Sequence, residues 1–541
     1  MPLNRLRMVS KVAGISILLW GATSAWCAEH PIQPTGTGKA YYVSVAGSDQ
    51  DDGLTPQTAF RNITTADHLL ERMGTQAGGS VIYVMPGVYT ENVGPFHTVS
   101  LRADGRPGFP ITLTSHEPEH PAILDGQADL EAGNTGRPAL ALDIGHHWRI
   151  KNLELRNGTV GIVLNSSIGS IVEDLNIHDI AGTGGINPSG IKLMSNCYDC
   201  VIRNNLVQNV RTSDGLAPQN AMGIALFGGN NCVVHNNELL DCGSGIRYKH
   251  HSTRRKPEEV FKTLIFRNRV ERFLTGGIVI ATDNARVFEN VVSNGPTGFL
   301  TDYGDGAPYR NNCFYHNSLY GVQTGFYSDP NVESRDSIFR DNGIAAGTAV
   351  YVKGWETLKS SDHNAFSTDR FRTPEKAVAT LADMQARGHD THSLAGVALF
   401  ADAPKDFALA KDSPARGRSS EGQHIRAYRT DSPDYVIGRF TRQPADLTPP
   451  DVSILSPTEG DVVSGKVEVS AQASDHVGVT GVQFMLGPQK LGALLSGTPF
   501  RVDWDTTAVP NGTYALTALA RDEAGNVMTA MSVIVVVRNA R

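Results

Sequence analysis

Positive charge and long apolar runs are both scarce in this sequence of 541 residues, and each scarcity excludes a class of protein. Lys and Arg number 48 against 55 Asp and Glu, which gives a formal net charge of -7. A general nucleic-acid-binding protein is usually basic overall, so we expect no nucleic-acid partner. Beyond residue 28, no apolar run approaches the roughly 20 residues that a membrane-spanning helix needs. We therefore expect no transmembrane segment.

Cysteine is scarce as well, with six residues, and Cys27 lies near the N-terminus. The spacing Cys197-x-x-Cys200 is not followed by a second matching pair, so it does not favour a structural zinc site. The five later cysteines cannot all pair within one chain, because their number is odd.

The N-terminus has the pattern of an export signal. Three basic residues precede an uncharged apolar run over residues 12–22, and Ala25 and Ala28 offer cleavage sites. The run is too short to span a membrane, although a retained anchor is the alternative. We predict a signal peptide over residues 1–28 and a secreted or periplasmic bacterial protein.

Helix-favouring runs are few, whereas glycine, with 55 residues, and clusters of asparagine are abundant, which favours turn-rich β-structure. The informative pattern is a glycine followed by an alternating apolar strand. These glycines are 21 to 33 residues apart, a spacing that suits one solenoid coil with loop insertions. They are Gly161, Gly190, Gly223, Gly245, Gly277, Gly298 and Gly321.

Each unit also holds a second strand that ends in asparagine, as in Val201–Asn205, Val233–Asn237, Leu264–Asn268 and Val287–Asn290. Equal positions of stacked coils lie about 4.8 Å apart, so these asparagines can hydrogen-bond to one another in a ladder. A leucine-rich horseshoe is the main rival, but its leucine spacing and helical segments are absent. The sequence therefore predicts an all-β fold, a right-handed parallel β-helix.

Cys200 and Cys232 directly precede two of these strands, which places their sulfur atoms on adjacent coils. A disulfide and a buried stack of thiols would both fit this register. Export makes a disulfide possible, and we predict a disulfide between Cys200 and Cys232.

The open ends of a solenoid need covering, because unpaired strand edges invite aggregation. Residues Thr65–Met73 predict an amphipathic helix that covers the N-terminal coil. Together with Tyr41–Ser44 and Pro86–Tyr89, this region resembles the N-terminal cap of secreted pectate-lyase-like β-helix proteins. Gly388–Ser393 and Ser413–Ala415 resemble the closing coils of the same group. The resemblance covers residues 40 to 440 and implies the fold, since this group includes lyases, epimerases, hydrolases and binding proteins.

The C-terminal part has a different pattern. After the linker-like stretch Leu447–Pro450, short strands separated by turns suit a β-sandwich. The segments Ala473–Val479 and Val502–Thr506 resemble bacterial immunoglobulin-like modules, which implies a spacer or a surface-binding module. We expect a β-helix domain over residues 29–444 and an Ig-like β-sandwich over residues 445–541.

Residues two and four after each repeat glycine should face outward, because side chains alternate along a strand. A cationic group among them, on an otherwise acidic protein, indicates an acidic ligand such as a uronate polysaccharide. Arginine can clamp and neutralise a carboxylate, and a lysine or histidine base can then remove the acidified sugar proton, so that β-elimination cleaves the chain. We expect Lys249, His250 and Arg247 to be catalytic, with Lys249 or His250 as the base, and Lys192, His251, Arg254 and Asp302 to bind the substrate. The alternative is that these charges only solvate a long loop and pair with Glu258 and Glu259.

A partial resemblance supports the lyase interpretation. Lys249-His250-His251 falls where the chondroitinase-B and alginate-lyase type of β-helix has Arg-His-Gly after an alternating strand. That family takes a lysine base from the preceding coil, where this sequence has Phe227-Gly228-Gly229. The lysine is missing at that position, so the resemblance does not carry over that catalytic pair.

Three carboxylates of the next coils, Asp283, Asp302 and Asp305, leave other functions open. They could serve as acid and base of a glycoside hydrolase, bind Ca²⁺ through oxygen ligands, or act as ordinary turn residues. A non-catalytic polysaccharide-binding or adhesive surface protein is a further alternative. We predict a monomeric polysaccharide lyase acting on an acidic polysaccharide, with Ca²⁺ as the only cofactor considered.

Overall fold

The computed structural model describes residues 38–91, 99–127, 138–182, 187–249, 263–301, 309–328, 334–352, 354–403, 406–420, 425, 450–458, 460–474, 479–487, 489–522, 527–530 and 533–539. The chain divides into two compact units, residues 1–439 and 440–541, and each is described by itself. The predicted signal peptide and the predicted domain boundary at residues 444–445 lie outside the described residues. Within the described ranges, no helix combines the length and the apolar character needed to cross a bilayer.

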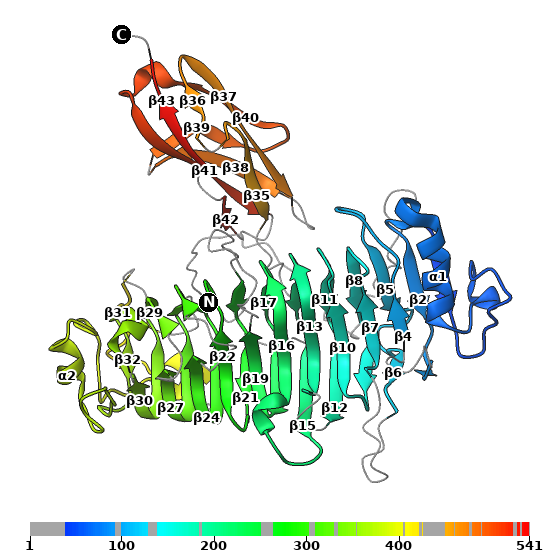
Figure 1. Ribbon diagram of the computed structural model, residues 1–541, viewed down its shortest axis with the longest axis horizontal. Coiled ribbons are helices and arrows are strands. Elements are labelled where there is room, and N and C mark those ends of the chain that lie inside the picture. Colours follow the sequence, from blue (N-terminus) through cyan, green and yellow to red (C-terminus); the bar gives the residue numbers. More distant parts are fainter. Residues whose placement is uncertain are drawn as a thin grey trace, which may run out of the picture. The chain divides into compact units, whose positions relative to one another are not determined.

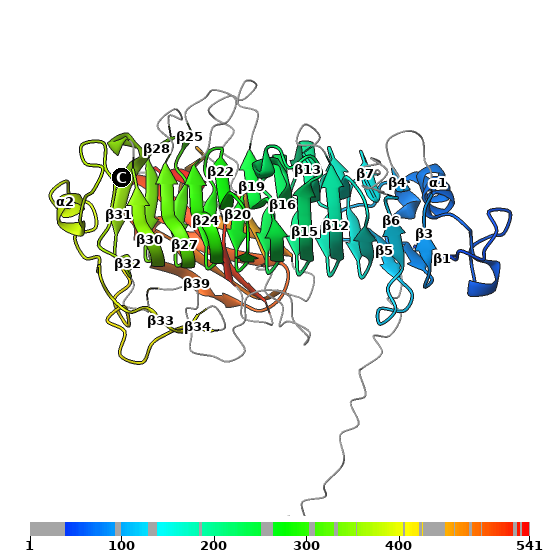
Figure 2. The same cartoon turned by 90° about the horizontal axis from the view of Figure 1, so that it is seen from below.

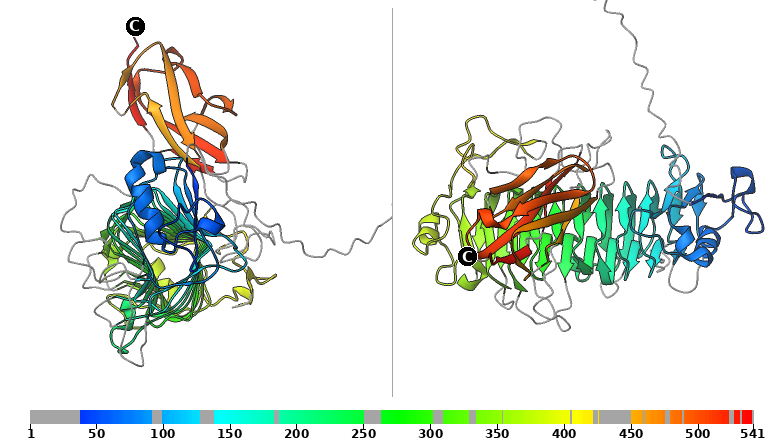
Figure 3. Two further views of the ribbon diagram at one scale, coloured as in Figure 1. Left: turned by 90° about the vertical axis from the view of Figure 1, so that its right-hand side faces the viewer. Right: turned by 90° about the horizontal axis from the view of Figure 1, so that it is seen from above.

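The first unit is a solenoid of parallel strands, as the glycine repeat predicts (Figure 1). Side chains alternate between its interior and its outside. In β13 (Ser189–Tyr198), for example, Ile191 and Leu193 are fully buried in the core. Figure 2 shows the strands side by side along the solenoid, and Figure 3 shows the same stack from one end. Equivalent apolar side chains of successive coils thus form continuous columns, which are the core of this unit.

One face of the solenoid is a twelve-stranded parallel sheet. In spatial order its strands are β1 (Ala40–Val43), β2 (Val81–Val84), β5 (Ile111–Ser115), β8 (Trp148–Lys151), β11 (Ile171–Glu173), β14 (Val201–Arg203), β17 (Val233–His235), β20 (Leu264–Phe266), β23 (Arg286–Phe288), β26 (Cys313–Tyr315), β29 (Ser337–Arg340) and β31 (Leu358–Asp362).

The remaining faces belong to an 18-stranded sheet, in which two parallel ladders merge at the long strand β24 (Val291–Thr301). The first ladder consists of β4 (Val99–Leu101), β7 (Leu140–Asp143), β10 (Val160–Asn165), β13, β16 (Met222–Asn230), β19 (Ser244–Lys249) and β22 (Gly276–Ala281). The second consists of β3 (Val88–Tyr89), β6 (Ile123–Asp125), β9 (Glu154–Arg156), β12 (Asn176–Gly182), β15 (Leu206–Thr212), β18 (Glu238–Cys242) and β21 (Arg269–Glu271). Beyond β24 the sheet continues through β27 (Ser318–Ser328), β30 (Gly343–Tyr351) and β32 (Ala365–Phe366).

At the repeat glycines, an added side chain would meet the backbone of the next coil. A Cβ atom on Gly245 would lie 2.3 Å from the backbone oxygen of Gly277, so no larger residue fits without a shift of the backbone. The first six glycines stack as predicted, but the prediction of Gly321 as the seventh is wrong. Phe299, which follows Gly298, pairs with Phe326, so the column continues through Gly325. Gly321 occupies a turn with φ of 64°. The reason is that β27 extends over two faces and holds both a turn glycine and a packing glycine.

The predicted asparagine ladder is present and longer than the sequence indicated. Each side-chain amide donates to the Oδ1 atom of the next coil's asparagine at 2.9 to 3.1 Å, and each also donates to a main-chain oxygen atom. Every member is fully buried. The ladder runs through Asn205, Asn237, Asn268, Asn290, Asn317, Asn342 and Asn364, and Asn364 donates to Asp390 at 3.0 Å.

The predicted disulfide between Cys200 and Cys232 is wrong, because all five described cysteines are free thiols. The pairing of Val201 with Val233 does place the two cysteines on adjacent coils, as expected. In-register parallel strands are about 4.8 Å apart and their Cβ atoms point the same way, whereas a disulfide needs Cβ atoms about 3.8 Å apart. The Cys200 thiol instead donates to the main-chain oxygen of Ser167 at 3.5 Å. Cys200 and Cys232 are both buried free thiols on adjacent coils, which is the expected alternative of a buried thiol stack.

Each end of the solenoid is covered. Helix α1 (Ile63–Met73) matches the predicted capping helix and buries Ile63, Ala66 and Leu70 against the first coils. Glu91 accepts hydrogen bonds from the main-chain N–H groups at the start of this helix. At the other end lies α2 (Leu381–Gln385), whose Met384 joins the core. The antiparallel pair β33 (Phe400–Asp402) and β34 (Asp406–Leu409) packs near this end against the outside of the sheet, where Phe400 and Phe407 contact Tyr320. A further pair, β25 (Tyr309–Arg310) and β28 (Ser334–Arg335), is parallel.

A buried ion-pair group lies on the outer row of the twelve-stranded sheet. Glu173 is 1% exposed and accepts hydrogen bonds from Arg149 and Arg203, the latter at 2.7 Å. Burial alone would raise the pKa of Glu173, but the two guanidinium groups outweigh it and lower that pKa to about 2. The carboxylate is therefore held charged by its partners.

Glu173→Gln should destabilise the solenoid by about 3 kcal/mol at neutral pH, because it removes the buried carboxylate that pairs with the buried Arg203 and the partly buried Arg149. A carboxylate with a depressed pKa stabilises the fold above its unfolded-state pKa of about 4.3 and loses this contribution as the pH falls through about 2. The difference in unfolding free energy between the wild type and the variant should therefore shrink as the pH falls from about 4.3 to about 2. Urea unfolding at several pH values measures it. Asp241→Asn, which breaks the exposed ion pair with Arg272, is the control and should cost well under about 1 kcal/mol. An equal cost for both variants would contradict this assignment.

The second unit is the predicted β-sandwich. One sheet contains β35 (Asp451–Ser456), β37 (Lys466–Ser474) and β40 (Phe500–Asp505). The other contains β36 (Val462–Val463), β43 (Val533–Val537), β41 (Gly512–Asp522), β38 (Val479–Leu486) and β39 (Gln489–Leu495), and β42 (Val527–Thr529) pairs with β41. Phe484, Trp504 and Leu516 are buried between the two sheets.

Candidate functional site

The three described cationic residues of the predicted site, Lys192, Arg247 and Lys249, lie on one outer wall of the solenoid, formed by β10, β13, β16, β19 and β22. The first outer row holds the residues two after each repeat glycine, and the pairing aligns Val163, Lys192, Ala225, Arg247 and Val279. The second outer row holds the residues four after it, and aligns Asn165, Met194, Phe227, Lys249 and Ala281. The intervening Tyr248 and Leu193 are fully buried in the core. The alternation therefore places Lys192, Arg247 and Lys249 together outside the core.

Lys192 is more enclosed than its outward position suggests. Its residue is only 7% exposed, and its Nζ atom donates a hydrogen bond to the Asn187 oxygen at 3.3 Å. The same amine lies 5.9 Å from the ring centroid of Phe227, a residue of the next coil. Burial lowers the pKa of the Lys192 amine below its ordinary value. This side chain therefore leans over β16 and holds its proton less firmly than an exposed lysine.

Arg247 lies two strands from Lys192 in the first outer row. Since adjacent strands are about 4.8 Å apart, the two backbones are about 10 Å apart, and only the small Ala225 lies between them. The Arg247 guanidinium donates to the Gln219 oxygen at 3.3 Å, and the residue is 9% exposed. Gln219 belongs to a short turn, Pro218–Asn220, that fixes the guanidinium over the wall. Lys249, half-buried, ends the same strand as Arg247.

Several predicted site residues lie outside the described residues. They are His250, His251, Arg254, Asp302 and Asp305, together with Glu258 and Glu259. The predictions about them, including the base role of His250 and the calcium ligands Asp302 and Asp305, therefore stay predictions. Asp283 is described, and its Oδ1 atom accepts a hydrogen bond from the Arg310 N–H at 2.6 Å, as a turn residue would.

Two aromatic residues on the same wall were not predicted from the sequence. Tyr327 continues the first outer row beyond Leu300 and pairs with Tyr351. Their rings lie edge to face with centroids 5.0 Å apart, and Arg372 lies 5.2 Å from the Tyr351 ring. The sequence does contain the repeat pattern here, as Gly325-Phe326-Tyr327. The prediction places the repeat glycine four residues earlier, at Gly321, and therefore misses Tyr327.

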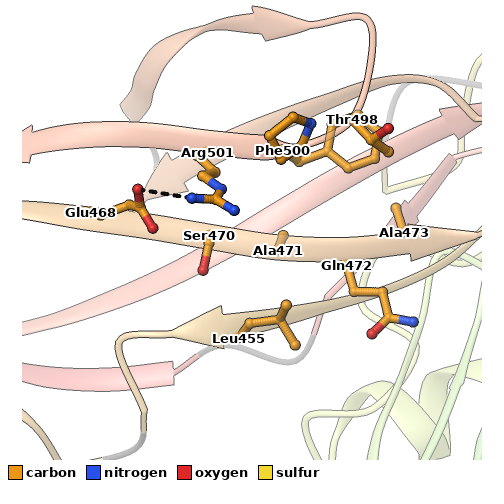
Figure 4. Close-up of a pocket in the computed structure, with 10 residues that line it drawn as sticks. Leu455, Glu468, Ser470, Ala471, Gln472, Ala473, Thr498, Phe500 and Arg501 are labelled. Atoms are coloured by element: carbon orange, nitrogen blue, oxygen red, sulfur yellow. Dashed lines mark hydrogen bonds and ion pairs between the residues drawn. The ribbon is translucent and has the colours of Figure 1, made fainter.

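A shallow pocket lies on the three-stranded sheet of the second unit (Figure 4). Leu455, Ser470 and Thr498 are among its lining residues, and Arg501 and Glu468 lie next to each other on one side of it. The Arg501 and Glu468 side chains form an ion pair at 3.5 Å, and both are more than half exposed. An exposed pair of this kind contributes little energy and leaves the pocket without net charge, so we assign no chemistry to it.

Comparison with known proteins gives matches for both units. Residues 131–261 and 222–371 match the family model described as the right-handed beta helix region, and residues 450–518 match the bacterial Ig domain. A pectate lyase of Emericella nidulans, PEL9, is 26% identical over 194 residues, which cover 34% of this chain and 44% of that protein. This chain thus matches less than half the length of that relative.

Solved structures to which the chain is similar include two lyases. A polysaccharide lyase of family PL6 from Pseudopedobacter saltans is 11% identical, with a TM-score of 0.40, and the match covers 70% of this chain and 99% of that one. A rhamnogalacturonan lyase is 15% identical, with a TM-score of 0.36, and the match covers 61% of this chain and 82% of that one.

Proposed function

We propose that this chain, a pectate-lyase-like right-handed β-helix followed by a bacterial Ig domain, is a secreted polysaccharide lyase that cleaves a uronate-containing polymer by β-elimination. The observation that carries the proposal is the pair of enclosed cationic groups, Lys192 and Arg247, on either side of Ala225 on one outer wall of an acidic protein. The sequence match to a pectate lyase supports the same reaction class.

Arg247 would neutralise the carboxylate of the bound uronate. A guanidinium binds a carboxylate with two parallel hydrogen bonds, which withdraws charge and makes the neighbouring C5–H more acidic. The short turn at Gln219 already holds this guanidinium in place, so little side-chain freedom is lost on binding. Lys249, next but one on the same strand, would add positive charge for the polymer.

Lys192 is the better placed of the two lysines to be the base. A general base must be deprotonated at the working pH, and burial lowers the pKa of Lys192. Its amine also lies over Phe227, on the coil that precedes Arg247, which is the coil that supplies the lysine in the chondroitinase-B and alginate-lyase type. This assignment changes the role expected from the sequence, in which Lys249 or His250 removes the proton and Lys192 only binds.

The reaction then follows from these two groups. Lys192 would take the C5 proton, the electron pair would form the C4–C5 double bond, and the C4–O bond would break with its electrons on the leaving oxygen. That oxygen takes a proton from an acid or from water. The products are a new reducing-end fragment and an unsaturated uronate end.

The proposal is tested by incubating the purified full chain with a panel of pectate, alginate and glycosaminoglycan polymers. We expect new ultraviolet absorbance from the conjugated double bond on at least one polymer. Reducing ends without that absorbance would show a hydrolase, and retention of polymer without either product would show a binding protein. Either result would overturn the proposal. Assays with and without a chelator test the calcium site predicted at Asp283, Asp302 and Asp305.

A further inference from the structure

The last strand of the twelve-stranded sheet ends in a carboxylate that contacts two imidazoles. Asp362 is the last residue of β31 (Leu358–Asp362), and His363 follows it. His392 lies on the next coil, where Leu394 pairs with Ala365. The Oδ2 atom of Asp362 lies 2.7 Å from Nδ1 of His392 and 3.5 Å from Nδ1 of His363. One potential ligand atom from each residue fits within a group whose members are all within 4.8 Å of one another.

The backbone around this group is fixed by buried contacts. Asn364, the last asparagine of the ladder, donates to the buried carboxylate of Asp390 at 3.0 Å, and the Ser361 hydroxyl donates to the same carboxylate at 2.7 Å. These bonds hold the segments before and after Asp362 against the segment that carries His392. The main-chain N–H of His392 also donates to Oδ1 of Asp362 at 2.7 Å. The three side chains therefore start from a defined backbone geometry.

We propose that Asp362, His363 and His392 bind a divalent transition-metal ion such as Zn²⁺, Ni²⁺ or Co²⁺. Two imidazole nitrogens and one carboxylate oxygen are ligands that such ions prefer, whereas Ca²⁺ and Mg²⁺ prefer oxygen alone. Ligand atoms about 2.0–2.1 Å from a metal are about 2.9 Å apart at right angles and about 3.4 Å apart in a tetrahedron. The separations of the Asp362 oxygen from the two imidazole nitrogens, 2.7 and 3.5 Å, bracket these values.

One side chain has to turn for binding. The His363 and His392 rings are stacked at 4.7 Å with 21° between their planes, and the lone pairs of parallel rings do not converge on one point. The His392 side chain is 67% exposed, so its ring can rotate about χ2 without disturbing the core. The remaining coordination positions face solvent and would take water. The ion would join β31 to the closing segment, and this site does not depend on the proposed lyase activity.

The test is a metal titration of the untagged full chain by calorimetry with Zn²⁺ and by visible absorption with Co²⁺. We expect the wild type to bind one equivalent more than the double variant His363→Ala/His392→Ala, and its thermal midpoint to rise with Zn²⁺ by more than that of the variant. The comparison uses the difference in equivalents, because other histidines such as His250 and His251 can also bind metal. Equal stoichiometry, or no binding by the wild type, would overturn the proposal.

Two further variants separate metal binding from loss of the fold. Asp362→Asn keeps a hydrogen-bond acceptor for the His392 N–H but removes the charged ligand, and should weaken binding at least about tenfold. His120→Ala removes an exposed histidine whose Nδ1 atom lies 3.7 Å from Glu117, outside the proposed ligand set, and should leave both the stoichiometry and the affinity unchanged. Unchanged affinity in Asp362→Asn would contradict the proposed ligand set.

Discussion

Lys192→Ala should lower kcat on the cleaved polymer by about 10²–10⁴-fold, the usual contribution of a positioned general base. The change in KM should be much smaller, because Arg247 and Lys249 still bind the uronate. Lys192→Arg should be as inactive as the alanine variant, since a guanidinium keeps the positive charge but cannot be deprotonated in this pH range. The rate of appearance of unsaturated product, measured over a range of polymer concentrations, separates the two parameters.

The matched control is Lys249→Ala, a lysine on the same wall in the second outer row. We expect it to raise KM and to leave kcat within a few fold of the wild-type value, because this side chain adds charge for binding. The reverse result, in which Lys249→Ala abolishes turnover and Lys192→Ala does not, would restore the assignment made from the sequence. Circular dichroism of each variant checks that the solenoid is intact.

The pH dependence gives a second, independent readout of the base. Burial disfavours the charged ammonium form of Lys192, so its pKa lies below the ordinary lysine value of about 10.4. The free amine is the active form, so kcat should rise with pH through a pKa below that value. This rise of kcat with pH should be absent in Lys192→Arg, whose residual activity should not depend on that pKa.

Asn268→Ala should cost the solenoid about 3 kcal/mol or more of unfolding free energy. Asn268 lies inside the ladder, where its Oδ1 accepts from the main-chain N–H and the side-chain amide of Asn237 at 3.1 and 2.9 Å. Its own amide donates to the oxygens of Val234 and Phe266. Alanine leaves these groups buried without partners, and each such group costs about 1–3 kcal/mol. Chemical unfolding of the full chain, followed by tryptophan fluorescence and circular dichroism, measures the loss.

Two variants control for the position in the ladder. Asn205→Ala removes the first member, which has a ladder partner on one side only, and should cost less than Asn268→Ala. Asn196→Ala removes an exposed asparagine of β13 and should change stability by less than about 0.5 kcal/mol. Equal losses from all three variants would show that the ladder contributes nothing beyond the ordinary cost of an asparagine substitution.

Much of the fold could be predicted because two periodic signals agree. The glycine repeat marks where backbones touch, and the alternation after each glycine separates core from outside, as for Ile191 and Lys192. The error at Gly321 has a local cause, since a turn glycine four residues before Gly325 produces the same short pattern. The disulfide error has a different cause, since adjacency in register does not bring the Cβ atoms of parallel strands close enough together.

The site could be placed on a wall from the sequence, but its chemistry could not. The repeat predicts that the side chains of Lys192 and Arg247 face outward. The enclosure of Lys192 depends instead on Asn187, which precedes its strand, and on Phe227 in another coil. Burial in these surroundings lowers the pKa of Lys192, and the sequence around Lys192 does not reveal that burial. The tyrosine pair at Tyr327 and Tyr351 was missed because the assigned register pointed to Gln323.

The asparagine ladder also bears on how a solenoid of this kind could lengthen during evolution. Asn268 and Asn290 are 22 residues apart and make the same bonds to their neighbours, so a tandem duplication of the segment between them would present identical contacts at both junctions. The inserted coil would extend the outer wall by one strand width, about 4.8 Å, while the capping elements at both ends stayed as they are. A β-helix of this kind can thus gain outer surface by tandem duplication of one coil, whereas an insertion of this length into the core of a globular domain would disrupt its packing.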